Sequence, residues 1–268
     1  MAKAIVSPLL ERGEYNPQHI LGIVGRSSSI TSSLNDLPMG VKVVSSEDSL
    51  AREVWKAPVK ILAVKPQQFS KIKESVSSFQ SNDQFPKPLL ISVLAGITLK
   101  SLKKAFPRHT CVRAVPNTPS IVAQGLTGLA WEDSITLAQK KVVRKIFEPI
   151  SEIYELEEQK LDSFLALTSS GPAYIALVVE AMADGAVAAG LPRHLSTELA
   201  HKTLSGTASL LRDKSLHPAE LKDMVASPAG TTISALRHLE LVGLRSALIE
   251  AVVLAAQKSR QLAEEVST

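Results

Sequence analysis

The chain has 268 residues and a mass of 28.7 kDa, which suits one large domain or two of ordinary size. Hydrophobic residues make up 45% and charged residues 21%, and this composition excludes wholesale disorder. Aromatic residues are only 4%, so the protein has few side chains on which bases could stack, and we expect no nucleic-acid partner. The formal net charge of +4 is spread over the chain, which serves solubility and favours an anionic small ligand where basic residues converge.

Cysteine usage and hydropathy predict where the protein works. Cys111 is the single cysteine, which excludes internal disulfides and a cysteine zinc cage and indicates a reducing compartment. The longest apolar stretch, residues 164–179, contains Thr168, Ser169 and Ser170 and is too short and too polar to span a bilayer. The N-terminal residues lack the pattern of an export signal. We therefore expect a cytoplasmic protein with no bound metal and no membrane segment.

The first part of the chain, residues 1–157, alternates short β-branched runs with polar, helix-like stretches. The runs are residues 20–24, 41–44, 59–64, 89–94, 111–115 and 126–131. Several of them are apolar on both faces, as in a parallel sheet that helices cover on each side. The pattern predicts a doubly wound, Rossmann-like α/β domain.

The second part, residues 158–268, has the pattern of helices only. One apolar stripe runs through Tyr174, Leu177, Val178, Ala181 and Met182, and a longer one begins at Leu244 and continues to Leu262. Small residues such as Gly185 and Gly206 allow close backbone approach between helices. We expect this helical domain to pack against a second subunit.

In an open α/β sheet, ligands bind beyond the carboxyl ends of the strands. Arg26 and Ser27 follow the first predicted strand, and no acidic residue there could accept a hydrogen bond from a ribose 2′-hydroxyl. This favours a 2′-phosphate, and hence NADP over NAD. An ordinary polar turn is the alternative interpretation.

Three further strand ends carry residues that force a turn or let another backbone come close. They are Lys65 with Pro66, Ala95 with Gly96, and Asn117 with Thr118 between Pro116 and Pro119. The two prolines around Asn117 would hold its polar side chain rigidly at a strand end. Taken alone, each of these is also compatible with a plain turn.

The strongest candidate site is the segment Ser227-Pro-Ala-Gly-Thr-Thr232, which precedes a predicted helix. Free backbone N–H groups at a helix start, together with the hydroxyls of Ser227, Thr231 and Thr232, could converge on one carboxylate. The segment therefore predicts an anion cradle. His217 lies just upstream, and we interpret it as a local hydrogen-bonding residue.

Taken together, these segments resemble pyrroline-5-carboxylate reductase, from Met1 to about Leu262. The motifs that carry the resemblance are residues 217–240, Ala63-Val64-Lys65-Pro66, Asn117-Thr118-Pro119, residues 170–174 and residues 189–193. The resemblance implies a Rossmann domain for NADPH, with NADH as the alternative cofactor, and a helical domain that interlocks with another subunit. It also implies a homodimer that assembles further into rings.

The resemblance also implies the chemistry of the site. The substrate is the cyclic imine 1-pyrroline-5-carboxylate, the product is L-proline, and the reaction is the last step of proline biosynthesis. The substrate carboxylate would be bound by N–H groups around Ser227, Gly230 and Thr231, with the Thr232 hydroxyl facing the ring nitrogen as the catalytic group. The cofactor would contact the strand ends. These contacts are expected at Arg26, Ser27, Ala63, Val64, Lys65, Pro66, Ala95, Gly96, Asn117 and Pro119.

The chain departs from the family pattern in two ways. Ser169 and Ala229 stand where the family usually has glycine, and Val115 replaces a customary methionine. In addition, residues 1–5 match the segment that normally follows the glycine-rich GxGxxx turn, so we expect the first strand and that turn to be absent. Two neighbouring strands would then lack a pairing partner.

Three explanations remain open at this point. In the first, the assigned translation start lies downstream of the true one. In the second, the protein is a catalytically inactive relative that acts as an oligomeric binding or regulatory module. In the third, it is another β-hydroxyacid-type dehydrogenase, which the cradle at residues 227–232 disfavours.

Overall fold

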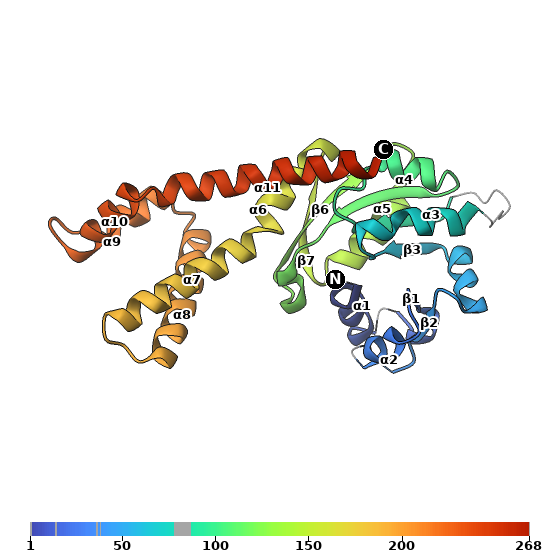
Figure 1. Cartoon of the computed structure of the whole chain (residues 1–268), viewed down its shortest axis with the longest axis horizontal. Helices are drawn as coiled ribbons and strands as arrows, with labels where there is room; N and C mark the ends of the chain where they lie inside the picture. Colours follow the sequence, from blue (N-terminus) through green and yellow to red (C-terminus); the bar gives the residue numbers. More distant parts are fainter. Residues whose placement is uncertain (1, 14, 36, 38, 78–86, 268) are drawn as a thin grey trace. The chain divides into compact units, whose positions relative to one another are not determined.

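A computed structural model describes residues 2–13, 15–35, 37, 39–77 and 87–267 (Figure 1). The chain divides into two compact units. Residues 1–169 together with 255–268 form an α/β unit, and residues 170–254 form a helical unit. Each unit is described by itself below.

The α/β unit contains short strands separated by helices and 3-10 turns. Its strands are β1 (Leu21–Val24), β2 (Lys42–Ser45), β3 (Val59–Leu62), β4 (Leu89–Ser92), β5 (Thr110–Val115), β6 (Gly125–Trp131) and β7 (Ser151–Glu155). Its α-helices are α1 (Ala2–Glu11), α2 (Ser29–Leu34), α3 (Phe69–Ser77), α4 (Leu99–Ala105), α5 (Leu137–Phe147) and α6 (Leu161–Thr168). The 3-10 turns are η1 (Pro17–His19), η2 (Ser49–Lys56), η3 (Pro66–Gln68), η4 (Thr118–Val122) and η5 (Glu158–Lys160).

The strands form two sheets. β1 pairs with β2 in parallel, and the other five strands follow the order β3-β4-β5-β6-β7. The sequence-based expectation of a parallel sheet holds for every pair except β5 and β6, which are antiparallel. Residues 116–124 are too few for the helical crossover that a parallel connection needs. The edge strand β7 has only two large apolar residues, Ile153 and Tyr154, and is not predicted from the sequence for that reason.

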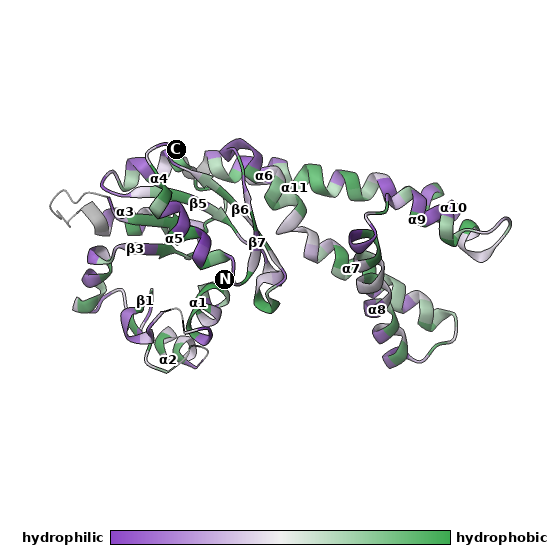
Figure 2. Ribbon diagram, turned by 180° about the vertical axis from the view of Figure 1, so that it is seen from behind, coloured by the Kyte–Doolittle hydropathy of each residue, from purple (hydrophilic) through white to green (hydrophobic). Residues whose placement is uncertain are grey.

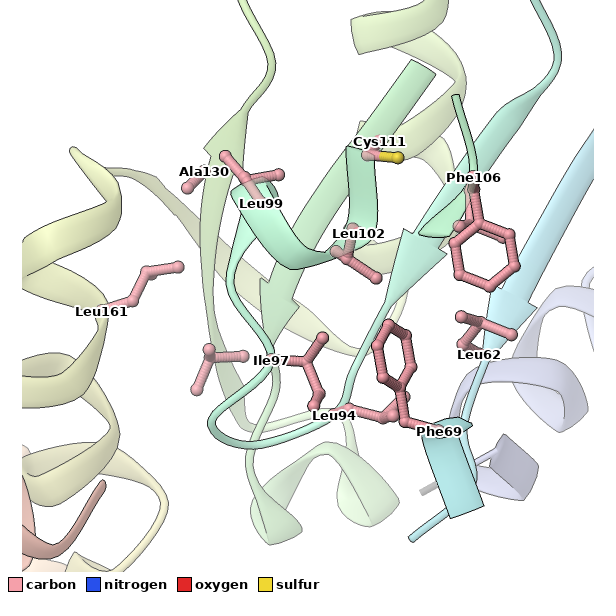
Figure 3. Close-up of a cluster of buried hydrophobic side chains, with 12 residues drawn as sticks. Leu62, Phe69, Leu94, Ile97, Leu99, Leu102, Phe106, Cys111, Ala130 and Leu161 are labelled. Atoms are coloured by element: carbon pink, nitrogen blue, oxygen red, sulfur yellow. The ribbon is translucent and has the colours of Figure 1, made fainter. Parts of the chain in front are cut away.

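Helices cover both faces of the five-stranded sheet, which explains why β4 and β5 are buried along their whole length. On one face, side chains from α3, α4 and α6 pack against Leu90 and Cys111. Figure 3 shows Cys111 and the labelled residues of these helices, Phe69, Leu99, Leu102 and Leu161. On the other face, Ile5 and Leu9 of α1 and Phe147 of α5 pack against the neighbouring residues of the same strands. In a strand that is buried on both faces, polar and apolar residues do not alternate, and the sequences of β4 and β5 show no such alternation.

The helical unit contains α7 (Gly171–Ala188), α8 (Arg193–Asp213), α9 (Pro218–Val225), α10 (Thr231–Leu241) and the first part of α11 (Leu244–Ser267). Its internal core is small, with Val179, Ala183, Ala200 and Leu204 between α7 and α8. Many large apolar side chains remain exposed on these helices. They include Ile175, Leu177, Met182, Leu199, Leu210, Leu241, Leu248, Ile249 and Leu254. Figure 2 shows hydrophobic residues, in green, along the ribbons of α7, α8 and α11.

The change in sequence pattern near residue 157 and the division between compact units fall at different positions. α6 belongs to the α/β unit because Leu161 and Ala166 are fully buried there. The last part of α11 returns to the same unit, where Ser259 is buried. A helical sequence pattern could not predict that α6 and the end of α11 belong to the α/β unit, because the pattern does not specify which surface a helix covers.

One segment passes a length-and-composition test for a membrane-spanning helix, Glu158–Ala188. In the structure this segment consists of η5, α6 and α7, with α6 ending at Thr168 and α7 beginning at Gly171. Asp162 in α6 pairs with a buried arginine of the sheet, as expected of a helix in a protein core. A core helix passes the same test, so the expected absence of a membrane segment stays a prediction.

Candidate functional site

The predicted cofactor residues after β1 are accessible. Arg26 and Ser27 are exposed, and their carbonyl groups accept hydrogen bonds from Ser29 and Ile30 in the turn that leads into α2. The backbone of these two residues is thus held beside a strand end, and neither side chain is buried. This is a suitable position for recognition of a phosphate, which prefers the planar donor array of arginine.

β3 ends at Leu62, two residues before its predicted end, so Ala63 and Val64 lie beyond the strand. Ala63 and Val64 are half-buried, whereas Lys65 is exposed at the start of η3. Pro66 begins that turn, and the Gln68 amide donates to the Lys65 carbonyl. The proline therefore directs the chain away from the sheet edge, as its fixed φ angle requires.

Gly96, after β4, lies against the chain's own C-terminal helix. It has a φ of +73°, and an added Cβ would lie 3.2 Å from the backbone nitrogen of Ala263 in α11. The sequence predicted that Gly96 lets another backbone come close, and the backbone of α11 at Ala263 takes this position within the α/β unit. The neighbouring Ala95 is exposed.

Asn117, after β5, is buried, and its side chain joins three segments. Its Oδ1 accepts from the Leu126 amide at 2.9 Å, and its Nδ2 donates to the Thr168 carbonyl at 2.9 Å. The Ser169 hydroxyl donates to the Pro116 carbonyl beside it, at 3.3 Å. Asn117 thus holds the start of β6 and the end of α6 at this strand end, while Pro119 lies half-buried in η4. Its contact with a cofactor stays a prediction.

A buried ionic network that was not predicted from the sequence lies on the same strand, β5. Arg113 of β5 is 1% exposed and contacts Asp162 at 3.1 Å and Glu158 at 3.4 Å. Asp162 also accepts from the Ser259 hydroxyl of α11 at 2.8 Å, and Glu158 accepts from the Leu99 amide at 2.6 Å. An arginine in the middle of an apolar strand was the available signal, since buried charges need partners.

The α9 start confirms the local role assigned to His217. Its Nδ1 accepts from the Ala219 amide at 3.2 Å, and the Glu220 carboxylate accepts from the His217 amide at 2.9 Å. This reciprocal capping box fixes the first turn of α9. The histidine is therefore part of the helix start.

The predicted cradle folds into a tight turn before α10. The Gly230 amide donates to the Ser227 carbonyl at 3.0 Å, and Ala229 adopts a left-handed φ of 55°. At Gly230, an added Cβ would lie 2.2 Å from the Ser227 hydroxyl and 3.1 Å from the Ser227 carbonyl oxygen, so a side chain there would require Ser227 to shift. Ala229 takes the left-handed conformation that glycine adopts more readily, in agreement with the departure noted in the sequence.

Beyond this turn, the first N–H groups of α10 are free to bind a ligand. The N-cap residue of α10 is Gly230, and no side chain caps this helix start with a hydrogen bond. Thr231 and Thr232 are the first two residues of the helix. Helix starts leave their first amides without intrahelical partners and carry a partial positive charge. Ser227 and Thr231 are exposed and Thr232 is half-buried, so a small carboxylate could reach these groups. The arrangement can bind and orient an anion.

Other reactive groups do not supply an alternative site in the described residues. No cluster of three or more histidine, cysteine or acidic side chains there could bind a metal. Burial raises the pKa of the Cys111 thiol to about 12, so this side chain stays protonated and is a poor nucleophile. The described chemistry is therefore binding and orientation by amides and hydroxyls.

Comparison with known proteins identifies the family. Residues 158–262 match the family described as pyrroline-5-carboxylate reductase dimerisation. A pyrroline-5-carboxylate reductase from Synechocystis sp. is 38% identical over 265 residues, which cover 99% of this chain and 96% of that protein. The chain belongs to the pyrroline-5-carboxylate reductase family.

Solved structures agree with this family relationship. A pyrroline-5-carboxylate reductase from Coxiella burnetii is 30% identical, with a TM-score of 0.81, and the match covers 97% of this chain and 94% of that one. The Plasmodium falciparum pyrroline carboxylate reductase, solved with NADP bound, is 26% identical with the same TM-score, over 97% of this chain and 93% of that one. The Rossmann-like fold followed by a helical region is thus confirmed for this chain.

Proposed function

We propose that this protein reduces 1-pyrroline-5-carboxylate to L-proline with NADPH, the last step of proline biosynthesis. The observation that carries the proposal is the similarity to reductases over 99% of the chain, combined with the free helix start at Thr231. An inactive binding module is not favoured, because the similarity extends over both halves of the chain. The same observation disfavours a different dehydrogenase, since the cradle belongs to the matched region.

The proposed chemistry relies on orientation. The substrate carboxylate binds amides around Ser227, Gly230 and Thr231, and the Thr232 hydroxyl faces the ring nitrogen. The substrate reacts as the protonated imine. Hydride adds to the imine carbon, which becomes C5 of proline, the electron pair of the C=N bond moves to nitrogen, and that nitrogen keeps its proton. Because a protonated imine is already electrophilic, positioning and a polar site suffice and no strong general acid is needed.

The cofactor contacts are proposed at the strand ends. Bound NADPH would supply the hydride, and Arg26 and Ser27 fit its 2′-phosphate because both are exposed after β1. NADH is the alternative donor. The remaining proposed contacts are Ala63, Val64, Lys65, Pro66, Ala95, Gly96, Asn117 and Pro119, of which Asn117 also positions neighbouring segments through its two hydrogen bonds.

The helical domain forms a homo-oligomer, as its family match shows. We assign residues 158–268 to this domain and residues 1–157 to the cofactor domain, and we propose that dimers assemble further into rings. The exposed apolar side chains of α7, α8 and α11 support a second copy as the covering partner, in place of lipid or nucleic acid. A cytoplasmic location is supported by the single, free cysteine.

Direct assay tests the proposed reaction. The purified protein is mixed with NADPH and 1-pyrroline-5-carboxylate, and both the loss of NADPH absorbance and the appearance of proline are followed. We expect the two to match in amount. The assay is repeated with a protein extended into the in-frame codons upstream of Met1. If neither protein produces proline, the proposed function is wrong.

A further inference from the structure

Arg113 is a charged residue within the buried central strand of the five-stranded sheet. Its side chain is 2% exposed, and it contacts two acidic residues, Asp162 of α6 and Glu158 of η5. Replacing such a buried ionic set by apolar residues of similar volume is often neutral or stabilising, so stability by itself gives no reason for an arginine at this position. The contacts do add geometric specificity, because charge-assisted hydrogen bonds hold their partners at set distances and angles.

Through Asp162, Arg113 holds the helix that ends beside Asn117. Arg113 Nη2 donates to Asp162 Oδ1 at 3.1 Å in the first turn of α6. At the other end of this helix, Asn117 Nδ2 donates to the Thr168 carbonyl at 2.9 Å. α6 has eight residues, which are too few for a helix to be stable without tertiary contacts. The position of its last turn, and hence of the Asn117 side chain, therefore depends on the contact at its first turn.

Through Glu158, the same arginine holds the loop after β4. Glu158 Oε1 lies 3.4 Å from Arg113 Nη1 and accepts from the Leu99 amide at 2.6 Å. Leu99 begins α4, shortly after the loop residues Ala95 and Gly96. One carboxylate oxygen thus connects β5 to the start of the helix that follows this loop.

A third connection reaches the same loop through α11. The Ser259 hydroxyl donates to Asp162 Oδ1 at 2.8 Å, so this oxygen accepts hydrogen bonds from two side chains. Ala263 lies one turn further along α11, and its backbone nitrogen would be 3.2 Å from a Cβ added at Gly96. The contacts of Arg113 and Asp162 therefore reach the loop after β4 by two routes and the end of β5 by a third.

We propose that Arg113 and Asp162 are positioning residues for the cofactor: without contacting it, they hold the strand ends after β4 and β5 in one fixed arrangement for binding. This inference rests on the proposed function, through the cofactor contacts proposed at Ala95, Gly96 and Asn117. A ligand that contacts two strand ends binds more tightly when both are already in place, because ordering them on binding lowers the affinity. The buried ionic contacts supply this order, whereas purely apolar packing can lose rigidity before it loses stability.

Three variants separate positioning from stability. Asp162→Asn keeps the shape of the side chain and removes one of the two acidic partners of Arg113. The double variant Arg113→Met with Asp162→Leu removes both charges, and it should regain most of the free energy of unfolding that Asp162→Asn loses. Glu158 is 30% exposed and remains in contact with water in this double variant. Glu132→Gln is the control, because Glu132 is 9% exposed and accepts from the Cys111 amide at 2.8 Å near the other end of β5.

The affinity for NADPH, measured by titrating the fluorescence of the cofactor, is the first measurement. We expect its dissociation constant to rise at least about tenfold in Asp162→Asn and in the double variant, and to stay unchanged in Glu132→Gln. Affinity should thus follow the contact of Arg113 and not the free energy of unfolding. In the reductase assay, Asp162→Asn and the double variant should raise KM for NADPH with little change in kcat at saturating cofactor.

Amide hydrogen exchange without cofactor is the second measurement. The Leu99 amide donates to Glu158 and the Leu126 amide donates to the Asn117 side chain, so both amides report on the two strand ends. We expect both to exchange at least about tenfold faster in the double variant than in the unchanged protein, although global stability is retained.

Two results would overturn the inference. The double variant could bind NADPH and exchange these amides as the unchanged protein does, which would make the role of the two residues structural only. Alternatively, affinity could fall in Glu132→Gln by as much as in Asp162→Asn, which would mean that any loss of stability weakens binding. This second comparison decides the matter if the double variant does not fold. If the unchanged protein neither binds NADPH nor forms proline, the proposed function is wrong, and positioning for a cofactor is wrong with it.

Discussion

Thr232 lies in the first turn of α10, where its side chain is half-buried beside the free helix start. We expect Thr232→Ala to lower kcat by about tenfold or more, because the hydroxyl proposed to face the ring nitrogen is lost. Thr232→Ser keeps the hydroxyl and should retain most of the activity. Steady-state kinetics, with chromatography to confirm that the oligomer is intact, measure both effects.

A suitable control for this experiment is Thr207→Ala. The Thr207 hydroxyl is exposed on α8 and donates only to the Thr203 carbonyl within the same helix. It should therefore leave turnover unchanged. Equal turnover in Thr232→Ala and Thr207→Ala would remove Thr232 from the mechanism.

His109 is a second residue with a testable property, because neither of its ring nitrogens has a partner among the described residues. It is 8% exposed and packs against Trp55 and Phe106. Burial, with the nearby charges of Lys60 and Lys87, lowers the pKa of His109 to about 4. The imidazole is therefore neutral in the folded protein at neutral pH.

The lowered pKa predicts how stability varies with pH. Between pH 6.5 and 4 the unfolded chain binds a proton at His109 that the folded chain does not, so the free energy of unfolding falls as the pH decreases through this window. The contribution is at most about 3 kcal/mol, reduced by solvent screening. His109→Phe should show a flatter pH dependence in denaturant titrations. Parallel curves for the two proteins would contradict the buried neutral imidazole.

At the scale of elements, Gly96 fixes the contact between the β4–α4 loop and α11. Gly96→Ala combines a strained left-handed φ of +73° with a Cβ 3.2 Å from the Ala263 backbone. Gly13→Ala is the matched control, because its φ is +68° and no atom lies within 4 Å of an added Cβ. We expect Gly96→Ala to cost at least about 1 kcal/mol more in unfolding free energy. Equal costs would mean that α11 does not constrain this loop.

The ionic network around Arg113 works at the same scale. It joins β5 to α6 through Asp162 and to the end of α11 through Ser259. Truncating one partner of such a buried set leaves an uncompensated charge, which is destabilising. The contact between Ser259 and Asp162 joins the end of α11 to the rest of the α/β unit.

For the whole molecule, the exposed apolar surface of the helical unit is the main feature. Leu177 on α7 is 66% exposed, and Leu248 on α11 is 40% exposed. A monomer rarely leaves so many apolar side chains in water, whereas a family with a dimerisation domain covers them with a second copy.

We therefore expect Leu177→Glu to weaken the oligomer by at least about tenfold in dissociation constant, because a carboxylate would be buried at the contact. Leu137→Glu is the control, since Leu137 on α5 of the α/β unit is 80% exposed. Sedimentation velocity over a range of protein concentrations measures both. An unchanged distribution for Leu177→Glu would place the contact on another face.

Much of the fold was predictable because its signals are local. The strands β1 to β6 were predicted within one or two residues, since apolar β-branched runs between polar stretches have few other outcomes. The capping role of His217 and the helix after Gly230 followed from short-range hydrogen bonding. The edge strand β7 and the antiparallel pairing of β6 were not predicted, because both depend on which neighbour a strand finds.

The residues of the candidate site divide in the same way. The sequence alone determines the helix start at Thr231 and the order of the strand ends. Secondary-structure propensity and helix capping depend on residues only a few positions apart, so both can be predicted locally. Two features needed the tertiary structure. They are the two hydrogen bonds of Asn117 and the ionic network of Arg113. Each joins groups far apart in the chain, and a local pattern carries no information about such partners.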